Sequence, residues 1–313
     1  MKIVFMGTPI YAASVLEDLI SSKHDIVGIL TKPDSPNGRS KKLISSPVKQ
    51  VALTHKIPLF QPDTLKNNDE ITNALKNLGA EVGVVVAYGL ILPEFILSSF
   101  PLGCLNIHPS LLPKYRGSSP VSTCILNGDT VTGISIIKLE SGIDSGPIFA
   151  QKKVPIEEME KCGPLTNRLF NISSLILIDV INKIGSGGMT LKKQYEKEAT
   201  YTKKLERADG LINWKDSANK ISNMVRAYDP WPGAHTVLNN KKLRVIESEV
   251  MLNTEFIQPV IPGEVLVNKD IIVGTGNGVI KLIKVQPEGK SVMSAKDFSN
   301  GNLQFHKSIL GST

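Results

Sequence analysis

Two polar side chains close an apolar run near the middle of the chain. Asn106 and His108 follow the apolar residues 103–105, and on a strand a spacing of two puts both side chains on the same face. An amide can donate a hydrogen bond to a developing oxyanion, and an imidazole can move a proton near neutral pH, so the pair suits acyl transfer. A structural pair, an edge-strand asparagine beside a hydrogen-bonded histidine, explains the two residues at least as well when they are considered alone.

The residues after His108 indicate how that pair is positioned. Pro109 removes a backbone donor and disfavours helix at the residue before it, so we predict that the strand ends at His108. Pro113, Gly117 and Pro120 interrupt the following stretch too often for a helix. The two side chains are therefore expected at a strand end, above an irregular loop.

Residues 106–117, NIHPSLLPKYRG, resemble the signature of the folate-dependent formyltransferases, which pass a formyl group from 10-formyltetrahydrofolate to an amine. In that family the asparagine and histidine act with an aspartate in a D-x-G context, which the segment SGIDSG supplies as Asp144. The resemblance implies that Asn106 donates to the oxyanion, that His108 stabilises it or transfers a proton, and that Asp144 orients His108. It places the pterin of the folate beside residues 87–92. It also implies that the folate donor is held by Ser110, Leu111, Leu112 and Pro113.

Length and composition restrict the class of protein. The 313 residues are enough for two domains, and 41% hydrophobic with 21% charged residues is ordinary for a soluble globular chain. No apolar run approaches the ~20 residues of a membrane helix, and the apolar strand at the N-terminus lacks the pattern of a signal peptide. We therefore expect a cytoplasmic protein with no membrane contact, and a monomer.

The cysteines and histidines give no sign of a metal site. Cys104, Cys124 and Cys162 are irregularly spaced and form no C-x-x-C pair, so neither a zinc site nor a disulfide framework is predicted. Cys104 and Cys124 lie in apolar surroundings typical of small core residues. We expect a reaction without metal and without a covalent cysteine intermediate.

The first part of the chain alternates strand-like and helix-like patterns. Apolar runs such as VGVVVA, residues 82–87, are typical of a parallel sheet covered on both faces. We therefore predict a Rossmann-like, doubly wound α/β catalytic domain over residues 1–188. The turn Gly7-Thr8-Pro9 lacks the later glycines of a dinucleotide-binding loop, and a tight turn is expected there. The stretch 31–46 is predicted to be a loop.

A long helix is predicted over residues 163–184, and a glycine-rich stretch ends it. After this point the sequence pattern changes. A polar, lysine-rich linker is expected over 189–206, followed by short alternating strands. Hairpin turns are predicted at Asn239-Asn240, at 268–270 and at 276–278. These signals favour a smaller, OB-like β-barrel domain over 207–313, which the resemblance implies is tRNA-binding.

Two stretches resemble the branch of the family that acts on methionyl-tRNA. One is the loop KPDSPNGRSKK, residues 32–42, and the other is DPWPG, residues 229–233. They imply initiator methionyl-tRNA as the acceptor, formylated for translation initiation, and tRNA contacts from Arg39, Lys41 and Lys42. The formal charge of +7, with 15 basic against 11 acidic residues after residue 200, is a modest indication of a polyanionic partner.

Two other functions stay open at this point. One is a folate-dependent formyltransferase that acts on a small amine or a sugar nucleotide. The other is a non-catalytic tRNA-binding relative that keeps the fold, although the intact set Asn106, His108 and Asp144 argues against it.

Overall fold

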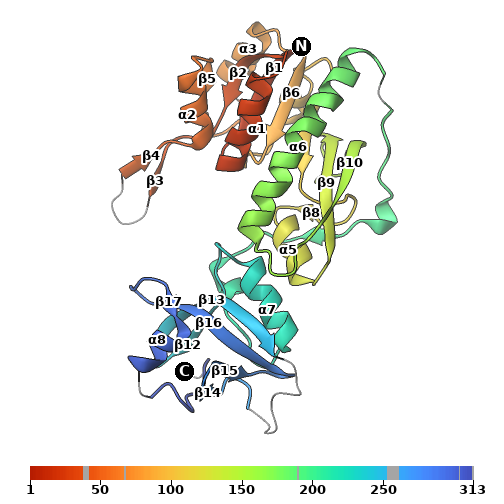
Figure 1. Cartoon of the computed structure of the whole chain (residues 1–313). Coiled ribbons are helices and arrows are strands. Elements are labelled where there is room, and N and C mark those ends of the chain that lie inside the picture. The colour runs from red at the N-terminus through yellow and green to blue at the C-terminus, as the bar shows by residue number, and fades with distance from the viewer. Residues whose placement is uncertain (38–41, 67, 189, 252–260, 303, 312–313) are drawn as a thin grey trace. The chain divides into compact units, whose positions relative to one another are not determined.

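The computed structural model describes residues 1–37, 42–66, 68–188, 190–251, 261–302 and 304–311 (Figure 1). The chain forms two compact units. The first consists of Met1–Gly117, Val131–Pro155 and Thr166–Tyr201, and the second of Ser118–Thr130, Ile156–Leu165 and Thr202–Thr313. Each unit therefore combines stretches that are distant in sequence, and the domain limits expected at 188 and 207 stay a prediction.

The first unit is built on a seven-stranded sheet in the order β10-β9-β7-β6-β1-β2-β5. The strands from β7 to β5 are parallel, and β9 and β10 add an antiparallel edge. The elements of this part of the chain are β1 (Lys2–Gly7), α1 (Ile10–Ile20), β2 (Asp25–Leu30), β3 (Ser35–Asn37), β4 (Lys42–Ile44), α2 (Pro47–Thr54), β5 (Leu59–Phe60), α3 (Asp69–Asn77), β6 (Val82–Val86), α4 (Glu94–Leu97), β7 (Cys104–His108), β8 (Arg116–Gly117), β9 (Val131–Lys138), β10 (Ile148–Pro155), α6 (Cys162–Gly185), the 3-10 turn η2 (Glu196–Glu198) and β11 (Tyr201–Thr202).

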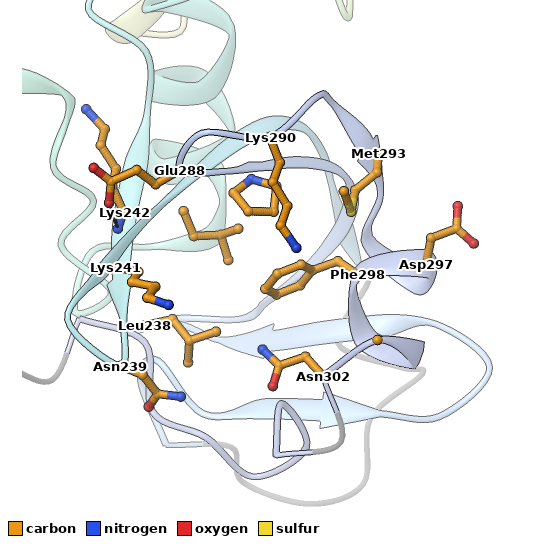
Figure 2. A pocket seen from close by; sticks show the side chains of 13 residues that line it. Leu238, Asn239, Lys241, Lys242, Glu288, Lys290, Met293, Asp297, Phe298 and Asn302 are labelled. Atoms are coloured by element: carbon orange, nitrogen blue, oxygen red, sulfur yellow. Dashed lines mark hydrogen bonds between the residues drawn. The ribbon is translucent and has the colours of Figure 1, made fainter.

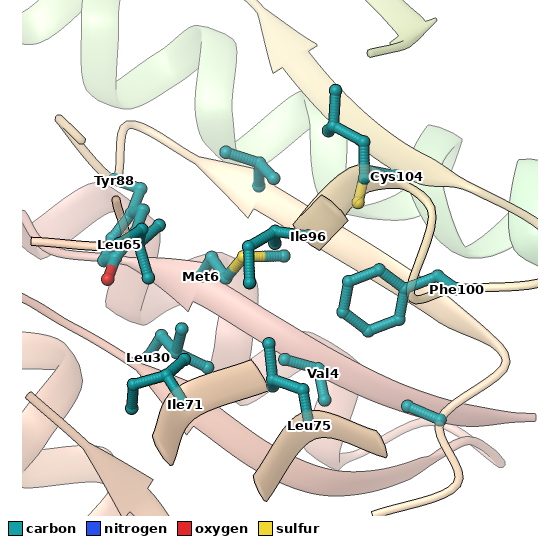
Figure 3. Close-up of a cluster of buried hydrophobic side chains, with 13 residues drawn as sticks. Val4, Met6, Leu30, Leu65, Ile71, Leu75, Tyr88, Ile96, Phe100 and Cys104 are labelled. Carbon is teal, nitrogen blue, oxygen red and sulfur yellow. The ribbon is translucent and has the colours of Figure 1, made fainter. Parts of the chain in front are cut away.

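Helices cover both faces of this sheet. On one face, Val4 and Met6 of β1 pack with Ile71 of α3 and Ile96 of α4 (Figure 3). Alternate β1 residues point the other way, toward α1 and α6, whose rings Tyr11 and Phe170 stack 4.4 Å apart. The predicted doubly wound α/β domain is confirmed.

Two turns of the first unit test local predictions. Thr8 donates its hydroxyl to the carbonyl of Tyr88 at 3.0 Å, and Pro9 precedes α1, so the Gly7-Thr8-Pro9 stretch is a turn tied to the end of β6. The prediction of an unstructured loop over 31–46 was wrong in part. Ser35–Asn37 and Lys42–Ile44 pair antiparallel as β3 and β4. Proline and glycine content obscured this short hairpin, because three-residue strands are too short to show a period.

The second unit holds an antiparallel half-barrel in the strand order β12-β13-β16-β15-β14, with β17 paired to β16. This confirms the predicted small C-terminal β domain. Its elements are α5 (Pro120–Leu126), η3 (Arg207–Gly210), α7 (Ala218–Ala227), β12 (His235–Leu238), β13 (Lys241–Met251), β14 (Val265–Val267), β15 (Ile271–Gly274), β16 (Val279–Pro287), β17 (Met293–Ser294) and α8 (Ala295–Asn300). Helix α5 packs against α7, so a helix that follows the catalytic motif in sequence belongs to this unit.

All three predicted hairpin turns join paired strands. Asn239 and Asn240, between β12 and β13, have φ of 49° and 60°, which asparagine tolerates better than most residues. Residues 268–270 connect β14 with β15, and 275–278 connect β15 with β16.

Candidate active site

Strand β7 places the two sequence-predicted side chains at its C-terminal end. Asn106 pairs with Val85 on β6 and with Ile137 on β9, and His108 pairs with Ser135. Both therefore leave the same face of the sheet, and the strand ends at His108, before Pro109, as predicted. His108 is 4% exposed, and Asn106 is half-buried.

His108 lies between two acceptors. Its Nε2 is 2.9 Å from the carbonyl oxygen of Tyr115, and its Nδ1 is 3.5 Å from Oδ2 of Asp144. A carbonyl oxygen can only accept, so this partner assigns a proton to Nε2. Nδ1 is then the nitrogen that faces Asp144 and can take up or deliver a proton.

The loop after β9 brings Asp144 to this position. Its Oδ2 accepts a hydrogen bond from the backbone N–H of Gly117 at 2.8 Å. Asp144 has φ of 46°, and a side chain at Gly146 would collide with the carbonyl of Lys138, so the loop is tightly constrained. The structure therefore brings together the three residues predicted to be catalytic.

Asn106 supplies a different kind of group. Within the described part of the chain its amide takes part in no hydrogen bond, whereas the His108 ring and the Asp144 carboxylate both have partners. An uncommitted amide beside a histidine–aspartate pair is suited to a developing negative charge, because it need not break a hydrogen bond first.

The four residues predicted to hold the folate form the loop between β7 and β8. Ser110 is fully buried, donates to the carbonyl of Lys114 at 2.7 Å and receives Ser135 Oγ on its own carbonyl at 2.7 Å. Leu112 packs with Ile137 and Ile148. Leu111 and Pro113 are half-buried, and the Leu112–Pro113 peptide is cis. Within this stretch, Leu111 and Pro113 thus keep more surface available to a ligand than Ser110 and Leu112.

A second irregular stretch follows β6. Ala87 has φ of 46°, and Ile91 is 92% exposed although it is a large apolar side chain. The Tyr88 hydroxyl is buried and finds no hydrogen-bond partner among the described residues, and burial raises its pKa. Strained backbone and exposed apolar surface at the carboxyl end of a parallel strand fit a flat ring such as the expected pterin, whose faces can lie on apolar side chains while its polar edge meets backbone groups.

Arg116 and Gln194 belong to the site and were not predicted. Arg116 is fully buried and binds both carboxylate oxygens of Glu196, at 2.7 and 2.9 Å, and the hydroxyl of Tyr201 at 2.9 Å. Glu196 raises the pKa of the Arg116 guanidinium and Arg116 holds the pKa of Glu196 low. Gln194 accepts from Arg116 Nε at 3.1 Å. The contacts span about eighty residues, so no local pattern indicates them.

The thiol of Cys104 lies on the strand that carries Asn106 and His108. Cys104 opens β7, and burial raises the pKa of its thiol to about 12, so it is almost entirely protonated near neutral pH. Among the residues that the structure describes, no group of three histidine, cysteine or acidic side chains could hold a metal ion. None of the described helices is long and apolar enough to cross a membrane.

Of the residues predicted to contact tRNA, Arg39 and Lys41 lie outside the described residues, and Lys42 begins β4. The half-barrel has basic surface of its own. A cavity of about 600 Å³ is lined by the basic side chains of Lys241, Lys242 and Lys290, by the acidic Glu288 and Asp297, and by apolar residues that include Phe298. Figure 2 shows the Lys241 and Lys290 side chains pointing toward the centre of this cavity. Burial lowers the pKa of Lys242, with Arg244 and Arg207 adding to the effect.

Comparisons with known proteins show the family to which the chain belongs. The family model for formyl transferase matches residues 1–181, and the one for the formyl transferase C-terminal domain matches 204–303. A methionyl-tRNA formyltransferase from Roseiflexus sp. (strain RS-1) is 43% identical over 303 residues, 96% of this chain and 92% of the relative. One from Chloroflexus aggregans (strain MD-66 / DSM 9485) is 42% identical over 294 residues, 94% of this chain and 95% of the relative.

A solved structure shares the fold. The N-formyltransferase from Helicobacter canadensis, in complex with folinic acid and dTDP-3-aminofucose, has a TM-score of 0.67 at 19% identity, covering 92% of this chain and 99% of that one. The family-model matches and the relatives that are 42–43% identical show that the chain belongs to the formyltransferase family of enzymes. The two relatives that are 42–43% identical to it over nearly its full length are methionyl-tRNA formyltransferases.

Proposed function

We propose that this enzyme transfers the formyl group of 10-formyltetrahydrofolate to the α-amine of initiator methionyl-tRNA, in the cytoplasm, for translation initiation. The observation that carries the proposal is the convergence of Asn106, His108 and Asp144 at the end of β7. The matched length and identity of the methionyl-tRNA formyltransferases support the choice of acceptor.

Each residue of the set has a role that its geometry allows. Asn106 donates its uncommitted amide to the oxygen of the formyl group as negative charge develops there. His108 holds its Nε2 proton against Tyr115 and exchanges a proton through Nδ1, beside the carboxylate of Asp144. The folate supplies the formyl carbon, and its nitrogen takes a proton as the carbon–nitrogen bond breaks and the new amide forms. The α-amine titrates near ~8, so a neutral nucleophile is present without a strong base.

The donor fits the irregular surface beside this set. Residues 87–92 supply the exposed Ile91 and strained backbone. In our assignment the motif loop with Ser110, Leu111, Leu112 and Pro113 also holds the folate donor. Ser110 and Leu112 give this loop its shape, through Lys114 and Ile137, and Leu111 and Pro113 offer surface to the ligand.

One assay tests the acceptor. The full chain is given the same folate donor with either methionyl-tRNA or glycinamide ribonucleotide. We expect rapid formylation of methionyl-tRNA and background formylation of the nucleotide. Preference for the nucleotide or another small amine would overturn the proposal in favour of a small-molecule formyltransferase. Absence of turnover with every acceptor would favour a non-catalytic relative.

Arg39 is proposed to place the acceptor end of the tRNA, with Lys41 and Lys42 adding charge. Arginine's planar fork can make two directed hydrogen bonds, whereas lysine supplies a mobile point charge. Arg39→Lys should therefore lower kcat/KM for methionyl-tRNA by roughly 5- to 150-fold, more than Lys41→Ala does. If both variants lost the same small amount of kcat/KM, Arg39 would contribute no more than one of several positive charges. A matching loss of folate affinity would assign the hairpin to the donor site.

A further inference from the structure

Residues 192–201 come back to the catalytic loop after α6. Lys192 pairs with Ile148 through both of its backbone groups, at 2.8 and 3.0 Å. Thr200 accepts the N–H of Arg116 at 2.8 Å on its carbonyl and the N–H of Tyr115 at 2.8 Å on its hydroxyl. The segment is thus held at both ends, and Gln194 lies between these two attachments.

Both N–H groups and the oxygen of the Gln194 amide make hydrogen bonds with residues of the site. Its Nε2 donates to the carbonyls of Asp144 and Gly146, each at 2.7 Å, and its Oε1 accepts from Nε of Arg116 at 3.1 Å. One side chain therefore links the loop that carries Asp144 to the residue between Tyr115 and Gly117.

Those two neighbours of Arg116 are the partners of the catalytic pair. The Tyr115 carbonyl receives His108 Nε2, and the Gly117 N–H donates to Asp144 Oδ2. Tyr115 and Asp144 both have positive φ, at 61° and 46°, a conformation that costs of order 1–3 kcal/mol in a non-glycine residue and persists only when surroundings hold it. Gln194 donates hydrogen bonds to the backbone of this strained segment, at Asp144 and Gly146.

We propose that Gln194 is a positioning residue, whose two N–H groups hold the Asp144 loop so that the carboxylate faces His108. The inference rests on the proposed roles of His108 and Asp144 in formyl transfer. The hydrogen bonds of the Gln194 side chain go to the carbonyls of residues 144 and 146 and to Arg116, so it acts on the catalytic pair through these groups.

Two substitutions separate the donor function from the link to Arg116. Gln194→Met keeps the length of the side chain and removes every hydrogen bond. Gln194→Glu keeps an acceptor for Arg116 and removes both donors to the carbonyls. Because small displacements of a catalytic group can cost up to about 10²-fold, kcat for both variants should fall roughly 10- to 100-fold, with KM for both substrates within about twofold of the parent.

Gln286 provides a matched control in the half-barrel. It accepts from Arg244 at 3.1 Å and donates to the carbonyl of Lys290 at 3.0 Å, which is the same arginine–glutamine–carbonyl arrangement within the second unit. Gln286→Met should leave kcat and its pH profile at parent values. Thermal unfolding of all variants shows whether each is folded at the assay temperature.

A double-variant cycle with Asp144→Asn distinguishes positioning from general stabilisation. If Gln194 acts through Asp144, adding Gln194→Met to Asp144→Asn should lower kcat by less than about threefold, since neighbouring residues that act as a unit are not additive. Full additivity, parent-like kcat for Gln194→Met, or restored kcat for Gln194→Glu would each overturn the inference. Parent-like turnover and pH profile for Asp144→Asn alone would instead contradict the proposed role of Asp144.

Discussion

Arg116 in the first unit and Lys290 in the second are both cations next to a candidate binding surface, yet they are held in opposite ways. Arg116 is fully buried and its guanidinium is bound by Glu196, Gln194 and Tyr201. Lys290 is exposed at the rim of a cavity, and its ammonium group makes no ion pair with the described residues. The charge of Arg116 thus holds neighbouring residues of the protein in place, whereas the charge of Lys290 stays available to a polyanion.

The difference indicates what each region can tolerate. A catalytic set needs atoms held within a fraction of an ångström, so the polar groups that support it, such as Arg116 and Gln194, are hydrogen-bonded to neighbouring residues. A phosphate backbone is recognised by many weak and interchangeable contacts, whose strength depends on salt. The site around His108 should therefore respond to single-atom changes and little to ionic strength, and the half-barrel should behave in the reverse way.

The largest expected effect comes from removing the reacting groups. Asn106→Ala and His108→Ala should each lower kcat by roughly 10²- to 10³-fold, the usual cost of one donor to a developing oxyanion, while tRNA affinity stays near the parent value. Steady-state formylation and tRNA binding at several salt concentrations provide the measurement. If the folded variants kept a near-normal kcat, the site around His108 would not be more sensitive to single substitutions than the half-barrel.

The position of this set could be predicted from the sequence, because its signals are local. A two-residue spacing put Asn106 and His108 on one face, and Pro109 ended β7 where expected. The Asn239-Asn240 turn was likewise readable, because a hairpin of this kind needs two residues that accept positive φ.

The support for the site could not be predicted in the same way. Arg116 looked like one charge in a loop, and Gln194 like one polar residue in a linker, but they meet across 78 residues inside the first unit. No periodicity or turn signal encodes such a pairing. The β3–β4 hairpin was missed for a different reason, since its strands are only three residues each.

The cavity of the half-barrel should show the opposite sensitivity. Replacing both Lys241 and Lys290 by methionine should weaken methionyl-tRNA binding by roughly tenfold at low salt. It should also reduce the slope of log affinity against log salt by about two, one for each phosphate that is no longer neutralised. At saturating tRNA, kcat should be unchanged. Lys269→Met, in the β14–β15 turn outside the cavity lining, is the control for an exposed lysine of the same unit. An equal loss of affinity for the control would make the cavity one part of a uniform basic surface.

The smallest effect is expected from removing the negative charge of Glu196, the ion-pair partner of the buried Arg116. Glu196 lies on η2, and hydrogen bonding to Arg116 lowers its pKa. A carboxylate whose pKa is lower in the folded state stabilises the fold fully above its unfolded pKa, and this contribution is lost as the pH falls through the folded value. Glu196→Gln should therefore lower the unfolding temperature by a few degrees near pH 7, because Arg116 stays buried without a counter-charge, and the difference from the parent should shrink as the pH falls below about 4.

Glu198→Gln, on the same 3-10 turn, is the matched control, and it should leave the unfolding temperature and its pH dependence unchanged. Thermal unfolding from pH 3.5 to 7.5 measures both variants. A gap between the parent and Glu196→Gln that stays constant over this range would mean that the carboxylate charge does not hold Arg116. The guanidinium would then be fixed by Gln194 and Tyr201 through neutral hydrogen bonds, and the contrast with Lys290 would be one of burial and not of charge pairing.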